Sequence, residues 1–189
     1  MDDLLTREQG ASLLQLARRA IGRRLGRREE SPALDDIVQR RRSGTFVTLK
    51  IAGELRGCIG NLEAAGSIAD AVERNACNAA FHDCRFSPLS PQELDRIHID
   101  ISILTPAVLL DYRDGEDLLR QLRPGIDGVI LSHGPAGATF LPQVWEQLPQ
   151  PEQFLGHLCR KAGLPERTWR EAHPEIRIYQ VQYFAEEGS

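Results

Sequence analysis

The sequence predicts an α+β fold with a mainly antiparallel, barrel-like sheet, built from two hairpin–helix–strand repeats after an additional N-terminal helix. Short turns join consecutive predicted strands, which favours antiparallel pairing. The order hairpin, helix, strand occurs twice, starting at Thr45 and again at Gly128. A length of 189 residues suits one domain or two closely joined halves. We therefore expect residues 1–189 to form a single domain with approximate halves 1–107 and 108–189, and both hairpins to share one sheet.

Two helices of the first half are predicted from their first residues. Thr6 and Gln9 have the spacing of a capping box, and apolar residues then recur at helical intervals, which predicts a helix over residues 7–25. Ser67 and Asp70 have the same spacing ahead of an alanine-rich amphipathic stretch, which predicts a second helix.

Strand patterns flank this second helix. Residues 45–51 alternate β-branched and aromatic side chains, Ala52-Gly53 suits a turn, and residues 54–59 return as the hairpin partner. A short helical turn is expected at Ser90-Pro91. Residues 97–104 place isoleucine at every second position, which predicts a strand with one core face and one mostly polar face.

The second half follows the same order. Residues 118–122 suggest a short helix, and the strands predicted at 128–132 and 137–141 form a hairpin. Pro151 suits the first position of a helix that runs to residue 162, and a final strand is expected over 176–184.

The composition indicates a globular protein outside the membrane. Hydrophobic residues make up 41% and charged residues 26% of the chain, which argues against disorder and against a coiled coil. No apolar run approaches the roughly 20 residues that a transmembrane helix needs. The acidic start of the chain lacks the apolar region of a secretory signal, so we expect a cytoplasmic protein.

An arginine-rich segment, residues 18–42, raises the possibility of nucleic-acid binding. It contains nine arginines against four acidic residues, whereas the whole chain has a net charge of −4. However, arginine is the general cation of this chain, and the segment lacks the interleaved aromatic residues on which bases stack. The sequence therefore argues against a nucleic-acid partner.

The stretch around Cys58 carries the first candidate site. Gly57 and Gly60 flank a Cys-Ile pair at a strand end, where a ligand or another backbone segment could come close. Arg56 would share a face with Cys58 on a regular strand and would favour the thiolate, the nucleophilic form of cysteine. The alternative is that Cys58 is a small buried residue and that the glycines only permit tight packing.

A second candidate cluster follows the second helix. His82 could act as a base, and Asp83 and Arg85 could pair with neighbouring groups. A relay from Cys58 through His82 to Asp83 is conceivable, but adjacent side chains diverge. The alternative is a loop that Asp83 and Arg85 hold in place after the helix.

Metal and cofactor motifs are missing from the sequence. The four cysteines have no CxxC spacing and no histidine pair has zinc-ligand spacing, so no metal site is predicted. The chain also lacks a P-loop, a GxGxxG loop and the HExxH and GxSxG motifs. We therefore predict no cofactor.

Five motifs, in order along residues 7–185, make the chain similar to the AMMECR domain family. They are Phe46-Val47-Thr48-Leu49 with Gly53-Glu54-Leu55-Arg56-Gly57-Cys58-Ile59-Gly60, Ala79-Ala80-Phe81-x-Asp83-x-Arg85-Phe86-x-Pro88-Leu89, Ile101-Ser102-Ile103-Leu104-Thr105-Pro106, Thr139-Phe140-Leu141-Pro142-Gln143-Val144-Trp145, and Phe154-Leu155-x-His157-Leu158-Cys159-x-Lys161-Ala162-Gly163-Leu164. The resemblance implies an α+β fold with two internal repeats around a barrel-like sheet. Bacterial and archaeal members are called AmmeMemoRadiSam system protein A, which implies a Memo-like protein and a radical SAM protein as partners.

The resemblance leaves the biochemical activity open, and Cys84 departs from it by replacing a usual proline. The residues on matched motif positions are the candidate site: Arg56, Gly57, Cys58, Gly60, Asp83 and Arg85. In one hypothesis Cys58 is a catalytic thiol, the two arginines bind an anionic group or favour the thiolate, and Asp83 orients an arginine or acts as a base. The alternatives are a non-catalytic binding or adaptor module and, more weakly, a nucleic-acid-associated factor.

Overall fold

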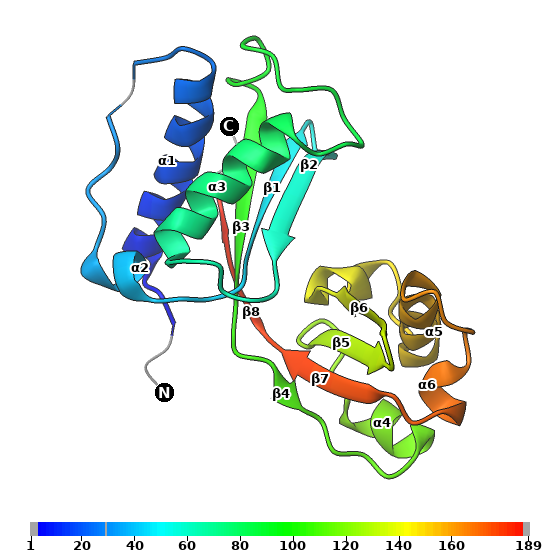
Figure 1. The fold of residues 1–189 in the computed structure, drawn as a ribbon. Helices are drawn as coiled ribbons and strands as arrows, with labels where there is room; N and C mark the ends of the chain where they lie inside the picture. The colour runs from blue at the N-terminus through cyan, green and yellow to red at the C-terminus, as the bar shows by residue number, and fades with distance from the viewer. Residues whose placement is uncertain (1–3, 29, 187–189) are drawn as a thin grey trace. The chain divides into compact units, whose positions relative to one another are not determined.

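The computed structural model describes residues 4–28 and 30–186, which divide into two compact units (Figure 1). The first unit is Met1–Leu104 with Gln182–Ser189, and the second is Thr105–Val181. The predicted boundary between residues 107 and 108 lies close to the change of unit after Leu104. That residues 1–189 act as a single domain stays a prediction.

The two long helices of the first unit begin where their capping residues predict. Helix α1 (Arg7–Arg24) follows Thr6, whose hydroxyl accepts a hydrogen bond from the Gln9 N–H at 3.2 Å. Helix α3 (Ile68–Phe81) has the same reciprocal capping box, with Ser67 as its N-cap. Such boxes satisfy N–H groups that have no partner within the helix. Both predicted helices are confirmed.

Two local predictions in this unit need correction. The short helix α2 (Asp36–Arg40) was not predicted, because it buries only Val38 and therefore shows no helical periodicity. The side chain of Asp35 caps it by accepting from the Ile37 N–H at 2.8 Å. Residues 91–96 form consecutive turns rather than the expected helical turn.

The sheet of the first unit has the strand order β2-β1-β3-β8. Its strands are β1 (Thr45–Ile51), β2 (Glu54–Asn61), β3 (Ile97–Leu104) and β8 (Val181–Ala185), and β1 pairs antiparallel with both β2 and β3. The hairpin turn at Ala52-Gly53 has φ angles of 52° and 83°, the left-handed conformation that tight hairpin turns require. The strands predicted at residues 45–51, 54–59 and 97–104 are confirmed.

Helices α1 and α3 cover one face of this sheet (Figure 1). Val47 and Leu49 of β1 and Ile99 of β3 are fully buried in the core on that face. The polar second face predicted for β3 is present, but Asp100 and Ser102 on it are buried rather than solvated. A buried carboxylate needs a partner, and this one is described with the candidate site below.

The second unit has a four-stranded sheet in the order β4-β7-β5-β6. The strands are β4 (Val108–Leu109), β5 (Gly128–His133), β6 (Ala136–Phe140) and β7 (Glu175–Tyr179). The predicted final strand over 176–184 is divided into β7 and β8 at Gln180, because the chain leaves the second unit after β7 and β8 joins the sheet of the first unit.

Four short helices complete the second unit. They are α4 (Gly115–Gln121), the 3₁₀ helix η1 (Pro142–Glu146), α5 (Pro151–Lys161) and α6 (Thr168–Glu171). In the core, the Trp145 ring from η1 stacks on the Phe154 ring from α5, with centroids 3.7 Å apart. The predicted helices at 118–122 and 151–162 are confirmed.

The α+β class is confirmed, but the barrel-like sheet is wrong. The two hairpins lie in separate open sheets, one hairpin in each unit. Within each sheet the arrangement nevertheless recurs, since the third strand pairs with the first hairpin strand in both cases: β3 with β1, and β7 with β5. Across the described residues, none of the helices is long and apolar enough to cross a bilayer.

Candidate functional site

Cys58 lies on β2, the edge strand of the first sheet, directly opposite Thr48 of β1. Its neighbour Gly57 packs against Ala79 of α3, and alternate residues of a strand point to opposite faces. The thiol of Cys58 is therefore on the sheet face away from α3. The Thr48 hydroxyl donates to its sulfur at 3.3 Å, and the Cys58 side chain is half-buried.

The backbone of Cys58 is held by two residues of the loop after α3. Asp83 Oδ2 accepts from the Cys58 N–H at 2.9 Å, and Arg85 Nη2 donates to the Cys58 carbonyl at 3.3 Å. An edge strand has unpaired backbone groups on its outer side, and these two side chains satisfy them in place of a further strand. We call Asp83 and Arg85 the clamp.

The clamp is itself a strong ion pair. Arg85 Nη2 and Nε donate to the Asp83 carboxylate at 2.7 and 2.9 Å, and the Asp83 side chain is only 3% exposed. The hydrogen bonds from Arg85, followed by that from the Cys58 N–H, hold the pKa of Asp83 well below its usual range. Such a carboxylate is a weak base, so the geometry favours the orienting role of Asp83 over the basic one.

Arg56 is held by Glu93 rather than by the cysteine. A bulge interrupts the β1–β2 register, so that Leu49 faces Gly57 while Lys50 faces Leu55, and Arg56 is the extra residue. Its Nε donates to Glu93 Oε1 at 2.8 Å; within the described chain its hydrogen bonds do not include the Cys58 thiol. The expectation of a shared Arg56–Cys58 face therefore fails, because it assumed a regular strand.

Glu93 belongs to the site although no sequence pattern pointed to it. It binds Arg56 and also accepts from the backbone and hydroxyl of Ser90, each at 2.8 Å. These hydrogen bonds, of which that from Arg56 has the largest effect, lower the pKa of Glu93 to about 2.

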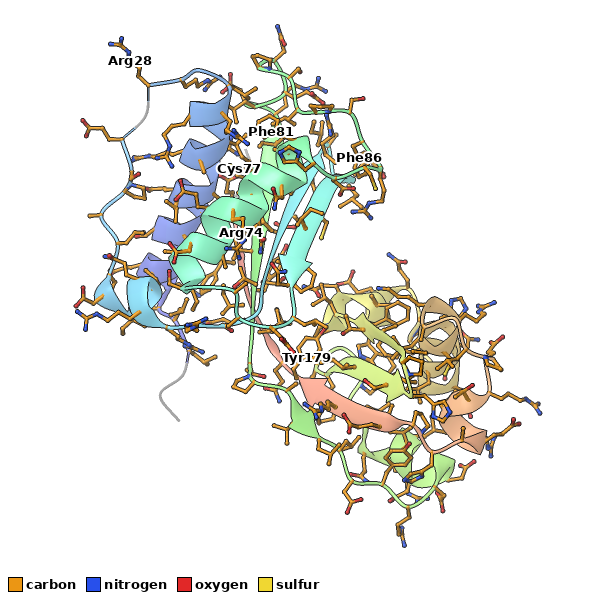
Figure 2. The ribbon with its side chains drawn as sticks, in the orientation of Figure 1. Arg28, Arg74, Cys77, Phe81, Phe86 and Tyr179 are labelled. Atoms are coloured by element: carbon orange, nitrogen blue, oxygen red, sulfur yellow. The ribbon has the colours of Figure 1, made fainter. Side chains whose placement is uncertain are left out.

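The Phe86 ring lies within cation–π distance of the guanidinium groups of Arg56 and Arg85. Figure 2 shows Phe86 on the loop that follows α3.

At the two glycines of the motif, the space that a side chain would take is occupied by other atoms of the protein. A Cβ at Gly57 would overlap the Ala79 carbonyl oxygen, and a Cβ at Gly60 would overlap the ring of Phe46. These positions thus allow the protein's own backbone and ring to approach closely, as the packing alternative for them proposed. Their binding role stays a prediction.

A polar row lies on the same sheet face as the cysteine. We use this name for Thr48, Lys50, His98 and Asp100, which the register places side by side, since Thr48 faces Asp100 and Lys50 faces His98. Lys50 Nζ is 2.6 Å from Asp100 Oδ2, and His98 Nε2 is 3.4 Å from Asp100 Oδ1. The alternating patterns of β1 and β3 indicated that these residues lie on a polar face. Only the pairing of β1 with β2 and with β3 shows that this is the face that carries Cys58.

The other thiols have different surroundings. Cys84 is exposed, Cys77 on α3 is half-buried (Figure 2) and Cys159 is buried. Burial raises the pKa of both the Cys77 and the Cys159 thiol. His82 is the exposed C-cap residue of α3. No group of three metal-ligating side chains occurs among the residues that the structure describes.

The arginine-rich segment is extensively paired. Arg18 binds the Glu186 carboxylate in a bidentate manner, with its Nε and Nη2 each donating at 2.6 Å. It also donates to the Leu94 and Ile97 carbonyls. Arg23 pairs with Glu73 and Arg27 with Asp95. These pairs reduce the positive charge that the segment presents at the surface. The absence of a nucleic-acid partner stays a prediction.

The site defines an α+β protein with a cysteine fixed on the clamped edge of a small sheet. The AMMECR1 family matches residues 14–184, and the chain therefore belongs to this family, as its motifs predicted. A protein of Methanothermobacter thermautotrophicus is 40% identical, covering 97% of both chains, and one of Thermofilum pendens is 38% identical, covering 96% of this chain and 92% of its own. The crystal structure of the uncharacterized protein PH0010 from Pyrococcus horikoshii is similar, with a TM-score of 0.86, 32% identity, and coverage of 97% of this chain and 94% of that one.

Proposed function

We propose that this protein is a component of the AmmeMemoRadiSam system and that it acts through the Cys58 thiol. One observation carries the thiol proposal. The clamp fixes the Cys58 backbone, while the half-buried side chain lies on a polar sheet face and its sulfur accepts a hydrogen bond from a hydroxyl. Functional groups held on rigid elements by supporting hydrogen bonds are characteristic of reactive sites. The link to the system rests on the resemblance of the motifs to its bacterial and archaeal protein A.

The surroundings of the sulfur suit a nucleophile. The Thr48 hydroxyl donates to it at 3.3 Å, which holds the sulfur in one direction on the polar face of the sheet. The clamp prevents the strand edge from fraying, so the thiol keeps one position. The concrete options are covalent chemistry of the thiol with an electrophilic substrate group, or delivery of a substrate within the three-protein system.

Site-resolved alkylation tests this proposal. Iodoacetamide is added to the folded protein, and mass spectrometry follows the modification of each cysteine. Cys84 is the control, because it is exposed and lies next to the clamp. We expect Cys58 to react about tenfold faster than Cys84 despite its lower exposure, since the clamp and the Thr48 hydroxyl hold its sulfur in one position. A Cys58 that reacts more slowly than Cys84 would contradict the proposal.

A second candidate is a non-catalytic adaptor. The observation that favours it is the filling of Gly57 and Gly60 by the protein's own atoms, which makes the motif a structural support. A pull-down with the Memo-like and radical SAM proteins separates the candidates. If the protein is an adaptor, a Cys58→Ser variant binds the partners and the system retains full activity. If the protein acts through the thiol, the same variant binds the partners but the activity of the system is lost.

A further inference from the structure

Thr139 in the second unit takes the place that Cys58 takes in the first. Each residue belongs to the fourth pair after its hairpin turn, where Cys58 faces Thr48 and Thr139 faces Ile130. Each also lies on the outer strand of its sheet, β2 in one case and β6 in the other. The backbone groups that point away from the hairpin partner are therefore at a sheet edge in both units.

A cation holds the carbonyl group of both residues. Lys161, the last residue of α5, donates from Nζ to the Thr139 carbonyl at 2.9 Å, and its ammonium group lies 5.0 Å from the centre of the Phe140 ring. Arg85, in the loop after α3, makes the corresponding contact with the Cys58 carbonyl. In each unit, the end of the helix that follows the hairpin thus brings a positive charge to the edge strand.

The N–H groups of the two residues differ in what they bind. In an antiparallel pair, the N–H and the C=O of one residue point to the same side. Because the Thr139 carbonyl meets a side chain at the outer edge, its N–H points outward as well. The Cys58 N–H donates to the Asp83 carboxylate, whereas among the described residues no side-chain carboxylate accepts from the Thr139 N–H.

The contacts at this edge select the chemistry of a ligand. The Thr139 N–H is a donor and the Lys161 ammonium group is positively charged, so the group that suits both is a negatively charged acceptor. An incoming strand would need the carbonyl of the edge residue as well, and that carbonyl already accepts from Lys161. The first unit shows which acceptor fits, because the carboxylate of Asp83 binds the equivalent N–H and the equivalent cation there.

We infer that the Thr139 N–H and the Lys161 ammonium group form a binding site for the carboxylate group of a ligand. The carboxylate takes the place in the second unit that the Asp83 side chain takes in the first. One unit therefore supplies this carboxylate from its own chain, and the other receives it from a ligand. The site lies outside the proposed function and does not depend on the Cys58 thiol.

NMR titration at constant ionic strength tests the site directly. The probes are acetate and a capped aspartate, N-acetylaspartate N-methylamide, and tighter binding of one or the other distinguishes a free organic acid from an acidic side chain. We expect a saturable downfield shift of the Thr139 amide proton. The Cys58 amide, which already donates to Asp83, should keep its position.

Three results would overturn the inference. The first is a Thr139 amide that does not shift or does not saturate with either probe. The second is a Kd that is unchanged in Lys161→Gln, where loss of the charge should raise it about tenfold or more. The third is tighter binding of inorganic phosphate than of both carboxylates, which would assign the edge to a different anion.

Matched variants separate binding at this edge from an effect on folding or on overall charge. Lys161→Gln keeps a donor for the Thr139 carbonyl, so amide exchange in β6 should match that of the wild type. Lys161→Arg keeps the charge and should bind within about threefold of the wild type, which keeps the test available should Lys161→Gln fail to fold. Lys50→Met removes the other lysine of the chain, and both this variant and Cys58→Ser should bind acetate as the wild type does.

Discussion

Replacing Asp83 with asparagine should loosen the edge strand that carries Cys58. Asparagine keeps the size of the side chain, but its amide NH₂ then faces Arg85 and the Cys58 N–H, which are themselves donors. Removing one partner of a buried ion pair costs about 3–5 kcal/mol. Because the Arg85 side chain is 53% exposed and water can replace part of the lost contact, we expect about 2–3 kcal/mol here.

Hydrogen exchange measures this loss where it occurs. A loss of about 2–3 kcal/mol corresponds to amide exchange in β2 that is about 30- to 150-fold faster in Asp83→Asn than in the wild type. Asp95→Asn is the control, because the Asp95 side chain is 70% exposed in its ion pair with Arg27. Amide exchange in β2 of this variant should match that of the wild type. Exchange in Asp83→Asn within about threefold of the wild type would refute the clamp.

The pH dependence of the clamp follows from the lowered pKa of Asp83. A carboxyl group with a depressed folded-state pKa stabilises the fold fully above its unfolded pKa, about 3.9 for aspartate. This contribution is lost as the pH falls below that value. The exchange difference between Asp83→Asn and the wild type should therefore be constant near neutrality and shrink in acid.

Three further predictions concern the surrounding contacts. Gly57→Ala should destabilise the fold by about 1–3 kcal/mol in urea denaturation, because its Cβ overlaps the Ala79 carbonyl, and an unchanged midpoint would contradict this packing. Glu93→Gln should cost about 2 kcal/mol at pH 7, a difference that disappears as the pH falls from about 4.5 to about 2; a difference independent of pH would argue against the Arg56 pair. Spectrophotometric titration should place the pKa of Tyr179 near 12, since burial raises it, and a value near 10 would contradict that burial.

Local signals made much of the fold predictable. The capping residue Thr6 marks the start of α1, Ser67 that of α3, and the alternation in residues 45–51 gives the bounds of β1. These features depend on neighbouring residues only, which is why one sequence suffices for them. The barrel was predicted wrongly because no local signal tells which strands share a sheet, and β8 joins a sheet far from it in sequence.

The candidate site was predictable in its parts but not in its contacts. The motifs identified Cys58, Asp83 and Arg85, and the structure joins these three. The Arg56–Glu93 pair escaped prediction because a bulge changes the strand register, and no pattern in the sequence marks this bulge. The polar row escaped it because Asp100 reaches Thr48 only through the pairing of β1 with β3.

Comparing each thiol in the folded and in the urea-unfolded chain tests the role of Cys58 most directly. The ratio of the two iodoacetamide rates isolates what the fold does to a given sulfur. We expect a ratio well above one for Cys58 and below one for Cys77 and Cys159, whose burial raises their pKa values. A ratio below one for Cys58 as well would show that the fold suppresses this thiol, which contradicts a function that depends on it.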